Sequence, residues 1–228
     1  LVQNSTVFHN LGLVITDEQH RFGVEQRRRL AGKGESPHSL VMSATPLPRT
    51  LALVVYGDLD LSVLDELPKG RQAVETLVIH SDKRNRALGF VKEHIAAGEQ
   101  AYIVCPLVEE SDSGLLAASQ YKDQIAGAFP GISVGLLHGK MRPAEKDAVM
   151  SAFQKNEIQL LVSTTVVEVG VDVPNATVMM VENAERFGLA QLHQLRGRVG
   201  RGSKKSYCIL VSDNDGEENR KRLKVMKS

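Results

Sequence analysis

Short runs of apolar and β-branched residues alternate with helical patterns along the whole chain, and this alternation constrains the fold more than any other feature. Strands that alternate with helices predict a parallel α/β sheet covered by helices on both faces. The predicted strands are residues 11–15, 39–43, 74–79, 101–105, 132–137, 158–162, 177–182 and 207–211. The predicted helices are residues 24–30, 48–56, 82–97, 115–127, 143–155, 189–199 and 216–227. Ligands bind beyond the carboxyl ends of such strands, so we expect the chemistry there.

A segment rich in proline, glycine and charged residues interrupts the alternation at residues 65–72 and predicts a domain boundary. The length of 228 residues corresponds to about one and a half typical domains. We therefore expect part of one α/β lobe at residues 1–68 and a complete lobe at residues 69–228.

The charge balance excludes a protein that coats nucleic acid as a bulk polycation, because 28 Lys and Arg oppose 27 Asp and Glu. Anion binding must then come from local clusters. No apolar run reaches the roughly 18 residues of a membrane span, and the N-terminus lacks the basic region of a signal peptide. Cys105 and Cys208 lie in predicted strands, which favours reduced core thiols in a cytoplasmic protein. Because the first residue is not Met, we also expect a fragment or a processed piece.

Two adjacent carboxylates, Asp17 and Glu18, follow the predicted strand 11–15. At the ligand-binding end of a strand, one carboxylate can hold hydrated Mg²⁺ and the other can orient or deprotonate an attacking water. The dipeptide by itself is also typical of a solvated junction between a strand and a loop.

Hydroxyl and basic residues follow two further predicted strands. Ser43 and Thr45 can relay hydrogen bonds between loops, or they can cap the next helix. His138 and Lys140 flank Gly139, where backbone N–H groups and a cation can approach a phosphate. An ordinary turn with an exposed lysine explains that segment equally well.

The segment after predicted strand 158–162 combines small polar residues with a glycine and an acid. Thr164 and Thr165 can bond sugar-phosphate oxygens. Gly170 allows close backbone approach, and Asp172 can accept from a ribose hydroxyl or an arginine. A loop with helix-capping threonines is the alternative.

The most specific pattern lies at residues 191–201. On a helix that reaches residue 199 and beyond, one stripe would carry Gln194, Arg198 and Arg201. Gly197 and Gly200 would cost such a helix about 1 kcal/mol each, a cost that a merely solvated basic face does not explain. Aligned arginines suit stabilisation of a transferring phosphoryl group.

In this order the motifs resemble the core of superfamily 2 helicases. Residues 17–20 resemble motif II, residues 43–45 motif III, residues 164–174 motif V and residues 194–201 motif VI. Longer matches look like the RecG family of DNA helicases, and the resemblance runs from about residue 11 to the C-terminus. They comprise residues 17–27, 45–50, 56–59 and 191–201.

The resemblance implies two RecA-like lobes of the P-loop NTPase type, with ATP and magnesium as cofactors and DNA as partner. It implies that Asp17 binds Mg²⁺, that Glu18 is the catalytic base, and that Arg198 and Arg201 are arginine fingers. The other implied residues are nucleotide contacts at Gln194, Gly170 and Asp172, coupling residues at His20, Ser43 and Thr45, and DNA-backbone contacts at His138, Lys140, Thr164 and Thr165.

The resemblance also implies missing parts, because the sequence contains no Gly-x-x-x-x-Gly-Lys-Ser/Thr phosphate loop and no region like the family's N-terminal wedge domain. We expect uncovered apolar surface on Leu13, Ile15 and Val41, and no ATPase activity of the chain alone. The expected parent is an ATP-driven double-stranded-DNA translocase that remodels forks and Holliday junctions in repair and recombination. The alternatives are a transcription-repair coupling factor translocase and a RecA-like binding module without hydrolysis.

Overall fold

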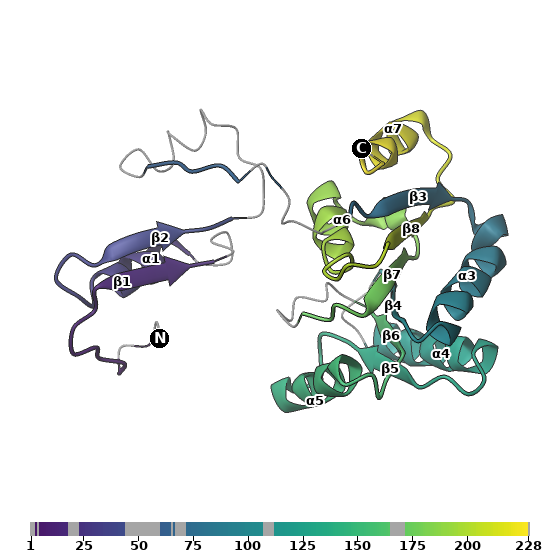
Figure 1. Cartoon of the computed structure of the whole chain (residues 1–228), viewed down its shortest axis with the longest axis horizontal. Helices are drawn as coiled ribbons and strands as arrows, with labels where there is room; N and C mark the ends of the chain where they lie inside the picture. The colour runs from purple at the N-terminus through teal and green to yellow at the C-terminus, as the bar shows by residue number, and fades with distance from the viewer. Residues whose placement is uncertain are drawn as a thin grey trace. The chain divides into compact units, whose positions relative to one another are not determined.

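The computed structural model describes residues 3, 5–17, 23–43, 60–64, 66, 72–106, 112–164 and 172–227. The chain divides into two compact units, Leu1–Asp65 and Glu66–Ser228 (Figure 1). The division lies close to the boundary that the sequence predicts between residues 68 and 69. The predicted helix at residues 48–56 lies outside the described residues.

The described part of the first unit is a β-α-β arrangement. Its elements are β1 (Leu13–Thr16), α1 (Val24–Ala31) and β2 (His38–Val41). The two strands pair in parallel. The predicted strands 11–15 and 39–43 are thus found with slightly different bounds.

One side of the β1–β2 pair is apolar and exposed. Leu13 and Ile15 are 54% and 56% exposed, as the sequence predicts. Val41 is half-buried instead, and the exposed large apolar residues of that stretch are Leu40 and Met42. The register explains the correction, because it pairs Ile15 with Leu40, and paired residues of parallel strands point to the same side.

The second unit contains a six-stranded, fully parallel sheet in the order β3-β8-β7-β4-β6-β5. Its strands are β3 (Glu75–Ile79), β4 (Gln100–Val104), β5 (Val134–Leu137), β6 (Leu160–Ser163), β7 (Ala176–Val181) and β8 (Tyr207–Val211). Its helices are η2 (Ser81–Lys83), α3 (Arg84–Ala96), α4 (Asp112–Ala128), α5 (Pro143–Gln154), η3 (Ala184–Arg186), α6 (Leu189–Arg196) and α7 (Glu217–Val225). All six strands that the sequence predicts after residue 72 are present.

Helices cover both faces of this sheet, which confirms the predicted fold class (Figure 1). Along β4, Ala101 and Ile103 join the core under α3 and α4, whereas Tyr102 and Val104 join the core under α5, α6 and α7. The central strand therefore has apolar residues on both sides and no polar face. Full burial of one such aliphatic side chain stabilises the folded state by about 1.5–3 kcal/mol.

Parallel pairing gives the sheet two distinct edges. We call the side where the strands end the carboxyl edge, and the side where they begin the amino edge. His138 and Thr164 follow β5 and β6 at the carboxyl edge. Helix α6 runs back across the sheet, so residues 197–206, which lead into β8, lie at the amino edge. Part of the expected chemistry, Arg198 and Arg201, is therefore not beyond the carboxyl ends of the strands.

In the part of the chain that the structure describes, no helix is long and apolar enough to cross a membrane.

Candidate functional site

Helix α6 ends at Arg196, three residues before the end that the sequence predicts at residue 199. Gly197 caps the helix, and its amide donates to the carbonyl oxygen of His193 at 3.0 Å. Gly200 then takes a φ of +73°, a left-handed conformation that favours glycine. The two glycines thus terminate the helix and turn the chain, as glycines commonly do. Because neither glycine lies inside the helix, neither destabilises it as a glycine in a helix interior would.

The predicted helical stripe is therefore wrong. Gln194 lies half-buried on α6, but Arg198 and Arg201 lie in the connection between α6 and β8. We call residues 197–206 the arginine loop. Its conformation, and not helical spacing, decides where the two guanidinium groups lie.

Arg201 is tied to two neighbours within this region. Its Nη1 lies 3.6 Å from Oδ1 of Asp172, and its Nε donates to the carbonyl oxygen of Gly197 at 3.1 Å. The side chain of Arg201 is 30% exposed and that of Asp172 56% exposed. Such an accessible pair contributes little stability. Together with the hydrogen bond from Nε to Gly197, it places the guanidinium beside Asp172. A guanidinium has five N–H donors, so Arg201 can also bind an anionic ligand.

Arg198, Arg201 and Asp172 all act electrostatically on one buried phenol, that of Tyr102. Burial raises the pKa of this phenol, the positive charges of Arg198 and Arg201 oppose that rise, and the negative charge of Asp172 adds to it. These three groups are therefore close enough to act on one hydroxyl that is buried in the core.

At the carboxyl edge, the structure brings His138 and Thr164 side by side. Leu137 pairs with Ser163, so the residues that follow them leave adjacent strands. The amide of Thr164 donates to the carbonyl oxygen of Leu137 at 3.2 Å. Thr164 is only 3% exposed. The two residues, both predicted to contact DNA, therefore lie next to each other.

Two buried polar atoms at this place, Nδ1 of His138 and Oγ1 of Thr164, have no hydrogen-bond partner among the described residues. A buried polar group without a partner costs about 1–3 kcal/mol. Native proteins contain few such groups, and an unfilled ligand site is one explanation for them. The pair marks a place where acceptor oxygens of a ligand, such as a phosphate, could accept from the threonine hydroxyl and from a ring N–H of the histidine.

Two lysines surround the pair. Lys140 is exposed in the turn after β5, and Lys146 in the first turns of α5 donates to the carbonyl oxygen of Gly139 at 2.7 Å. Burial lowers the pKa of His138, and the charges of Lys146 and Lys140 lower it further against the opposing effect of Glu145. The imidazole is thus neutral at neutral pH. Sequence reasoning missed Lys146, although its place three residues after Pro143 predicts the first turn of a helix beside this site.

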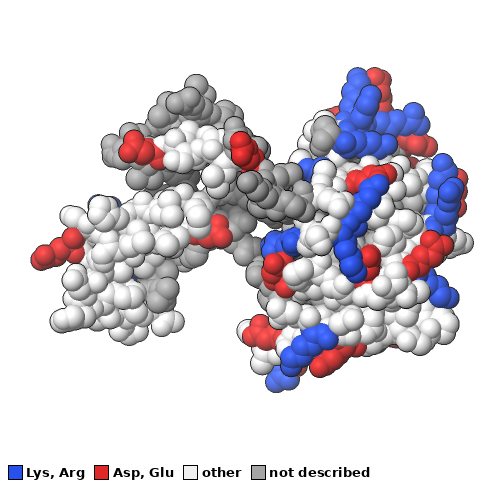
Figure 2. Space-filling model, viewed as in Figure 1, with Lys and Arg blue, Asp and Glu red and all other residues white. Residues whose placement is uncertain are grey.

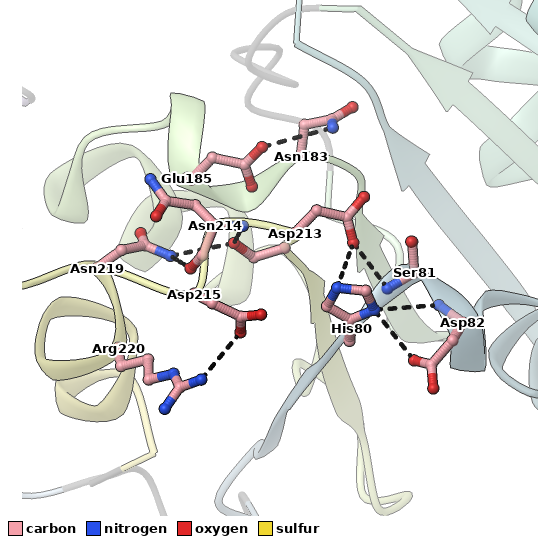
Figure 3. A network of polar contacts seen from close by, with 11 residues as sticks. His80, Ser81, Asp82, Asn183, Glu185, Asp213, Asn214, Asp215, Asn219 and Arg220 are labelled. Atoms are coloured by element: carbon pink, nitrogen blue, oxygen red, sulfur yellow. Dashed lines mark hydrogen bonds and ion pairs between the residues drawn. The ribbon is translucent and has the colours of Figure 1, made fainter. Parts of the chain in front are cut away.

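At the opposite end of the carboxyl edge, acidic side chains bond to groups that lie beside them (Figure 3). His80 follows β3, with Nδ1 3.3 Å from Asp82 Oδ1 and Nε2 3.4 Å from Asp213 Oδ1. The amide of Ser81 also donates to Asp213 at 3.0 Å. Acids here pair with local donors, and within the described ranges no group of three or more His, Cys, Asp or Glu residues could hold a metal ion.

On the side that Figure 2 shows, the Arg and Lys side chains of the described residues do not form one continuous basic face. Figure 2 shows blue and red groups interleaved over the visible side of the second unit, with a dense blue group over α7. This distribution agrees with the net charge of +1 and with anion binding through local clusters.

In the first unit, Asp17 and Ser43 follow the neighbouring strands β1 and β2, and both are exposed. The amide of Met42 donates to the carbonyl oxygen of Thr16 at 2.8 Å, so pairing continues up to these residues. An exposed carboxylate at a strand end suits hydrated Mg²⁺. The remaining predicted residues lie outside the described residues: Glu18, His20, Thr45, Thr165 and Gly170.

Curated relatives match nearly the whole chain. ATP-dependent DNA helicase RecG of Acidithiobacillus ferridurans is 56% identical over 229 residues, which cover 100% of this chain and 34% of the relative. The RecG proteins of Synechocystis sp. and Bacillus subtilis are each 53% identical over 228 residues, which cover 99% of this chain and 27% and 33% of the relatives. The chain thus spans about a third of the length of these relatives.

Solved structures of helicases also match nearly the whole chain. A structure of RecG bound to a three-way DNA junction matches with a TM-score of 0.81 and 48% identity, over 100% of this chain and 29% of that chain. S. cerevisiae Dbp5 bound to RNA and ADP BeF3 matches with a TM-score of 0.64 over 95% of this chain and 57% of that chain. At 14% identity, the second match shows the fold alone, which is the RecA-like fold of helicase lobes.

A family described as the helicase conserved C-terminal domain matches residues 69–203. The match includes β3 to β7, α6 and most of the arginine loop, so both candidate sites of the second unit lie inside it. The chain therefore belongs to the helicase conserved C-terminal domain family.

Proposed function

We propose that this chain forms part of the motor of an ATP-driven DNA translocase that remodels branched DNA in repair and recombination. Residues 69–228 would be its second RecA-like lobe and residues 1–68 the end of its first lobe. The RecG relatives, at 53–56% identity, support this reading over a coupling-factor translocase or a binding module without hydrolysis. The relative solved on a three-way DNA junction supports branched DNA as the substrate.

One observation carries the DNA-binding part of the proposal: two buried polar atoms without partners, on His138 and Thr164, lie beside Lys140 and Lys146. Phosphate oxygens would accept from the threonine hydroxyl and from the lysine ammonium groups. Contacts to phosphate oxygens carry no sequence information, so these groups, together with Thr165, would follow the phosphodiester backbone of single- and double-stranded DNA.

Charges on the two units suit magnesium-ATP, the second implied ligand. Asp17 is an exposed carboxylate at a strand end, and Arg198 and Arg201 lie in one electrostatic neighbourhood with Asp172. Magnesium-ATP, when bound, supplies the phosphoanhydride bond that is broken. Arg198 and Arg201 would stabilise the negative charge that develops on the phosphoryl oxygens, and Glu18 would orient and deprotonate water.

The other proposed residues position the nucleotide and connect it to DNA. Asp172 would accept from the ribose, with Gln194 and Gly170 nearby in the nucleotide site. His20, Ser43 and Thr45 would couple the nucleotide site to the DNA site. Because the arginines and Glu18 belong to different units, hydrolysis would require closure of the two units around ATP. A cytoplasmic location fits a motor that acts on bacterial DNA.

The test compares the complete gene product with the 228-residue chain. We expect the complete protein to hydrolyse ATP faster when a three-way junction is added, and the chain alone to show no measurable hydrolysis. In binding measurements by fluorescence anisotropy, Lys140→Ala should weaken junction affinity equally for different sequences and reduce the salt slope by about one unit. No junction-stimulated hydrolysis by the complete protein, or a change in sequence preference in Lys140→Ala, would contradict the proposal.

A further inference from the structure

The arginine loop is held against the starts of strands at several points. A Cβ atom on Gly202 would lie 2.7 Å from the carbonyl oxygen of Pro174, and one on Gly200 would lie 2.6 Å from Cγ2 of Val74. The loop carbonyl of Ser203 accepts from Nε2 of Gln72 at 2.9 Å. These neighbours precede β7 and β3, so the loop packs closely against the chain segments that lead into two strands of the sheet.

Its charged anchor is the pair between Lys204 and Glu99, the residue directly before β4. Nζ of Lys204 lies 3.4 Å from Oε1 of Glu99, whose side chain is only 13% exposed. The second carboxylate oxygen accepts from the hydroxyl of Thr177 on β7 and lies 2.6 Å from Nδ1 of His94 on α3. One carboxylate thus joins two elements of the unit to the arginine loop.

Glu99 is a fixed negative charge. Burial alone would raise its pKa, but hydrogen bonds from Thr177, His94 and Lys204 outweigh burial and hold the pKa below its ordinary value. The carboxylate is therefore ionised at neutral pH, and partners on several sides restrict its rotation. A partly buried charge of this kind is screened by solvent much less than an exposed one.

The adjacent residue provides an internal comparison. Lys205 pairs with Glu75 at 2.7 Å, but the two side chains are 56% and 45% exposed. An exposed ion pair between flexible side chains contributes little to stability or position. Two neighbouring lysines of one loop therefore each pair with a glutamate. Glu99 is partly buried and is bonded to further partners, whereas Glu75 is exposed.

We propose that Glu99, through Lys204, is a positioning residue that sets the place of Arg198 and Arg201 for ATP hydrolysis. In this role Glu99 would act on neither the nucleotide nor the arginines directly, and it would act by fixing the loop that carries the arginines. The inference rests on the proposed function, because it assigns Glu99 to the role proposed for the arginines. Positioning matters because a displacement of about 1 Å at a reacting centre can reduce a rate by about 100-fold.

The kinetic test uses the complete gene product with a saturating three-way junction. Glu99→Gln keeps the shape and an acceptor for Thr177 but removes the charge, and it should lower kcat about 10-fold with little change in KM for ATP. Glu75→Gln is the matched control and should stay within about 2-fold of wild type. An unchanged kcat in Glu99→Gln, or an equal loss in both variants, would overturn the inference.

A second variant tests the same ion pair without changing Glu99, so a kinetic defect can be told apart from misfolding. Lys204→Met removes the loop side of the pair at a half-exposed position, so the core carboxylate network keeps Thr177 and His94. It should reproduce the kcat defect of Glu99→Gln, and the double variant should be no worse than either single variant. Lys205→Met should have little effect. Additive losses in the double variant would show that Glu99 does not act through Lys204.

Two further measurements separate this inference from the proposed function. Arg201→Ala, assayed in parallel, tests whether the arginines act at all; normal hydrolysis there would defeat the proposed function itself. Amide hydrogen exchange on the 228-residue chain tests the anchor alone: residues 199–205 should exchange about 10-fold faster in Glu99→Gln and unchanged in Glu75→Gln. Equal exchange in wild type and Glu99→Gln would defeat the positioning role whatever the arginines do.

Discussion

The polar groups at the two edges of the six-stranded sheet differ in whether they already have partners. At the amino edge, Arg201 is tied to Asp172 and Lys204 to Glu99. At the carboxyl edge, buried polar atoms of His138 and Thr164 have no partner within the described residues. The first arrangement holds charge in place before a ligand arrives. The second carries a desolvation cost that a bound ligand would remove, so we expect ligand binding there to be coupled to stability.

The largest effect should come from the pre-placed charge at the amino edge. Arg201→Ala in the complete protein should lower kcat for ATP hydrolysis by about 10³-fold or more and leave nucleotide affinity nearly intact. Arg198→Ala should behave similarly, since both charges act on the same neighbourhood around Tyr102. Lysine at either position should rescue poorly, because an ammonium lacks the planar fork of donors. Phosphate release with parallel nucleotide titration measures both; unchanged hydrolysis would leave the loop a structural connection.

Next is the close packing that supports the arginine loop. Gly202→Ala would place a Cβ atom 2.7 Å from the backbone oxygen of Pro174, so the loop or the strand start must move. We expect a loss of about 1–3 kcal/mol in the free energy of unfolding, measured by urea denaturation of the chain. Gly89→Ala, in α3 with nothing within 4 Å of the added atom, should instead stabilise the chain by about 1 kcal/mol. Equal effects of the two substitutions would show that the loop is not closely held.

A pair of threonines compares the two edges directly. Thr164→Val removes a hydroxyl without a partner and should stabilise the chain by about 1 kcal/mol while weakening junction binding. Thr177→Val removes a hydroxyl that bonds Glu99 and should destabilise the chain by about 1–2 kcal/mol without weakening binding. Urea denaturation and anisotropy give the two readouts. Destabilisation by Thr164→Val would contradict the contrast between the edges.

The smallest effect is a pH dependence of DNA binding. The pKa of His138 is lowered by burial and by Lys146 and Lys140. The free imidazole is therefore neutral above about pH 6.5. A bound phosphate would favour the charged form, so binding should take up a proton and junction affinity should rise as the pH is lowered toward the pKa of the free imidazole, which lies below its ordinary value. His138→Gln should flatten this dependence, and a flat wild-type profile would exclude a phosphate beside the ring.

Some features of the candidate sites were predictable from sequence and others were not. The hydroxyl and basic residues at 138, 140 and 164 were predicted at strand ends, because turn residues after β-branched runs are a local signal. Gly197 and Gly200 were misinterpreted as costly residues within a helix. A positive φ, which shows that Gly200 turns the chain, is a property of the folded backbone and has no signature in residue spacing.

Local patterns of residues predicted the α/β class, the succession of strands and helices along the second unit and the motifs that resemble helicases, because each depends on residues that are close along the chain. The neighbourhood of His138 and Thr164 and the pair of Glu99 with Lys204 became evident only in the folded chain. Those contacts follow from the strand order β3-β8-β7-β4-β6-β5. Strand order is chosen by packing among distant segments around one core, and no local pattern of residues encodes it.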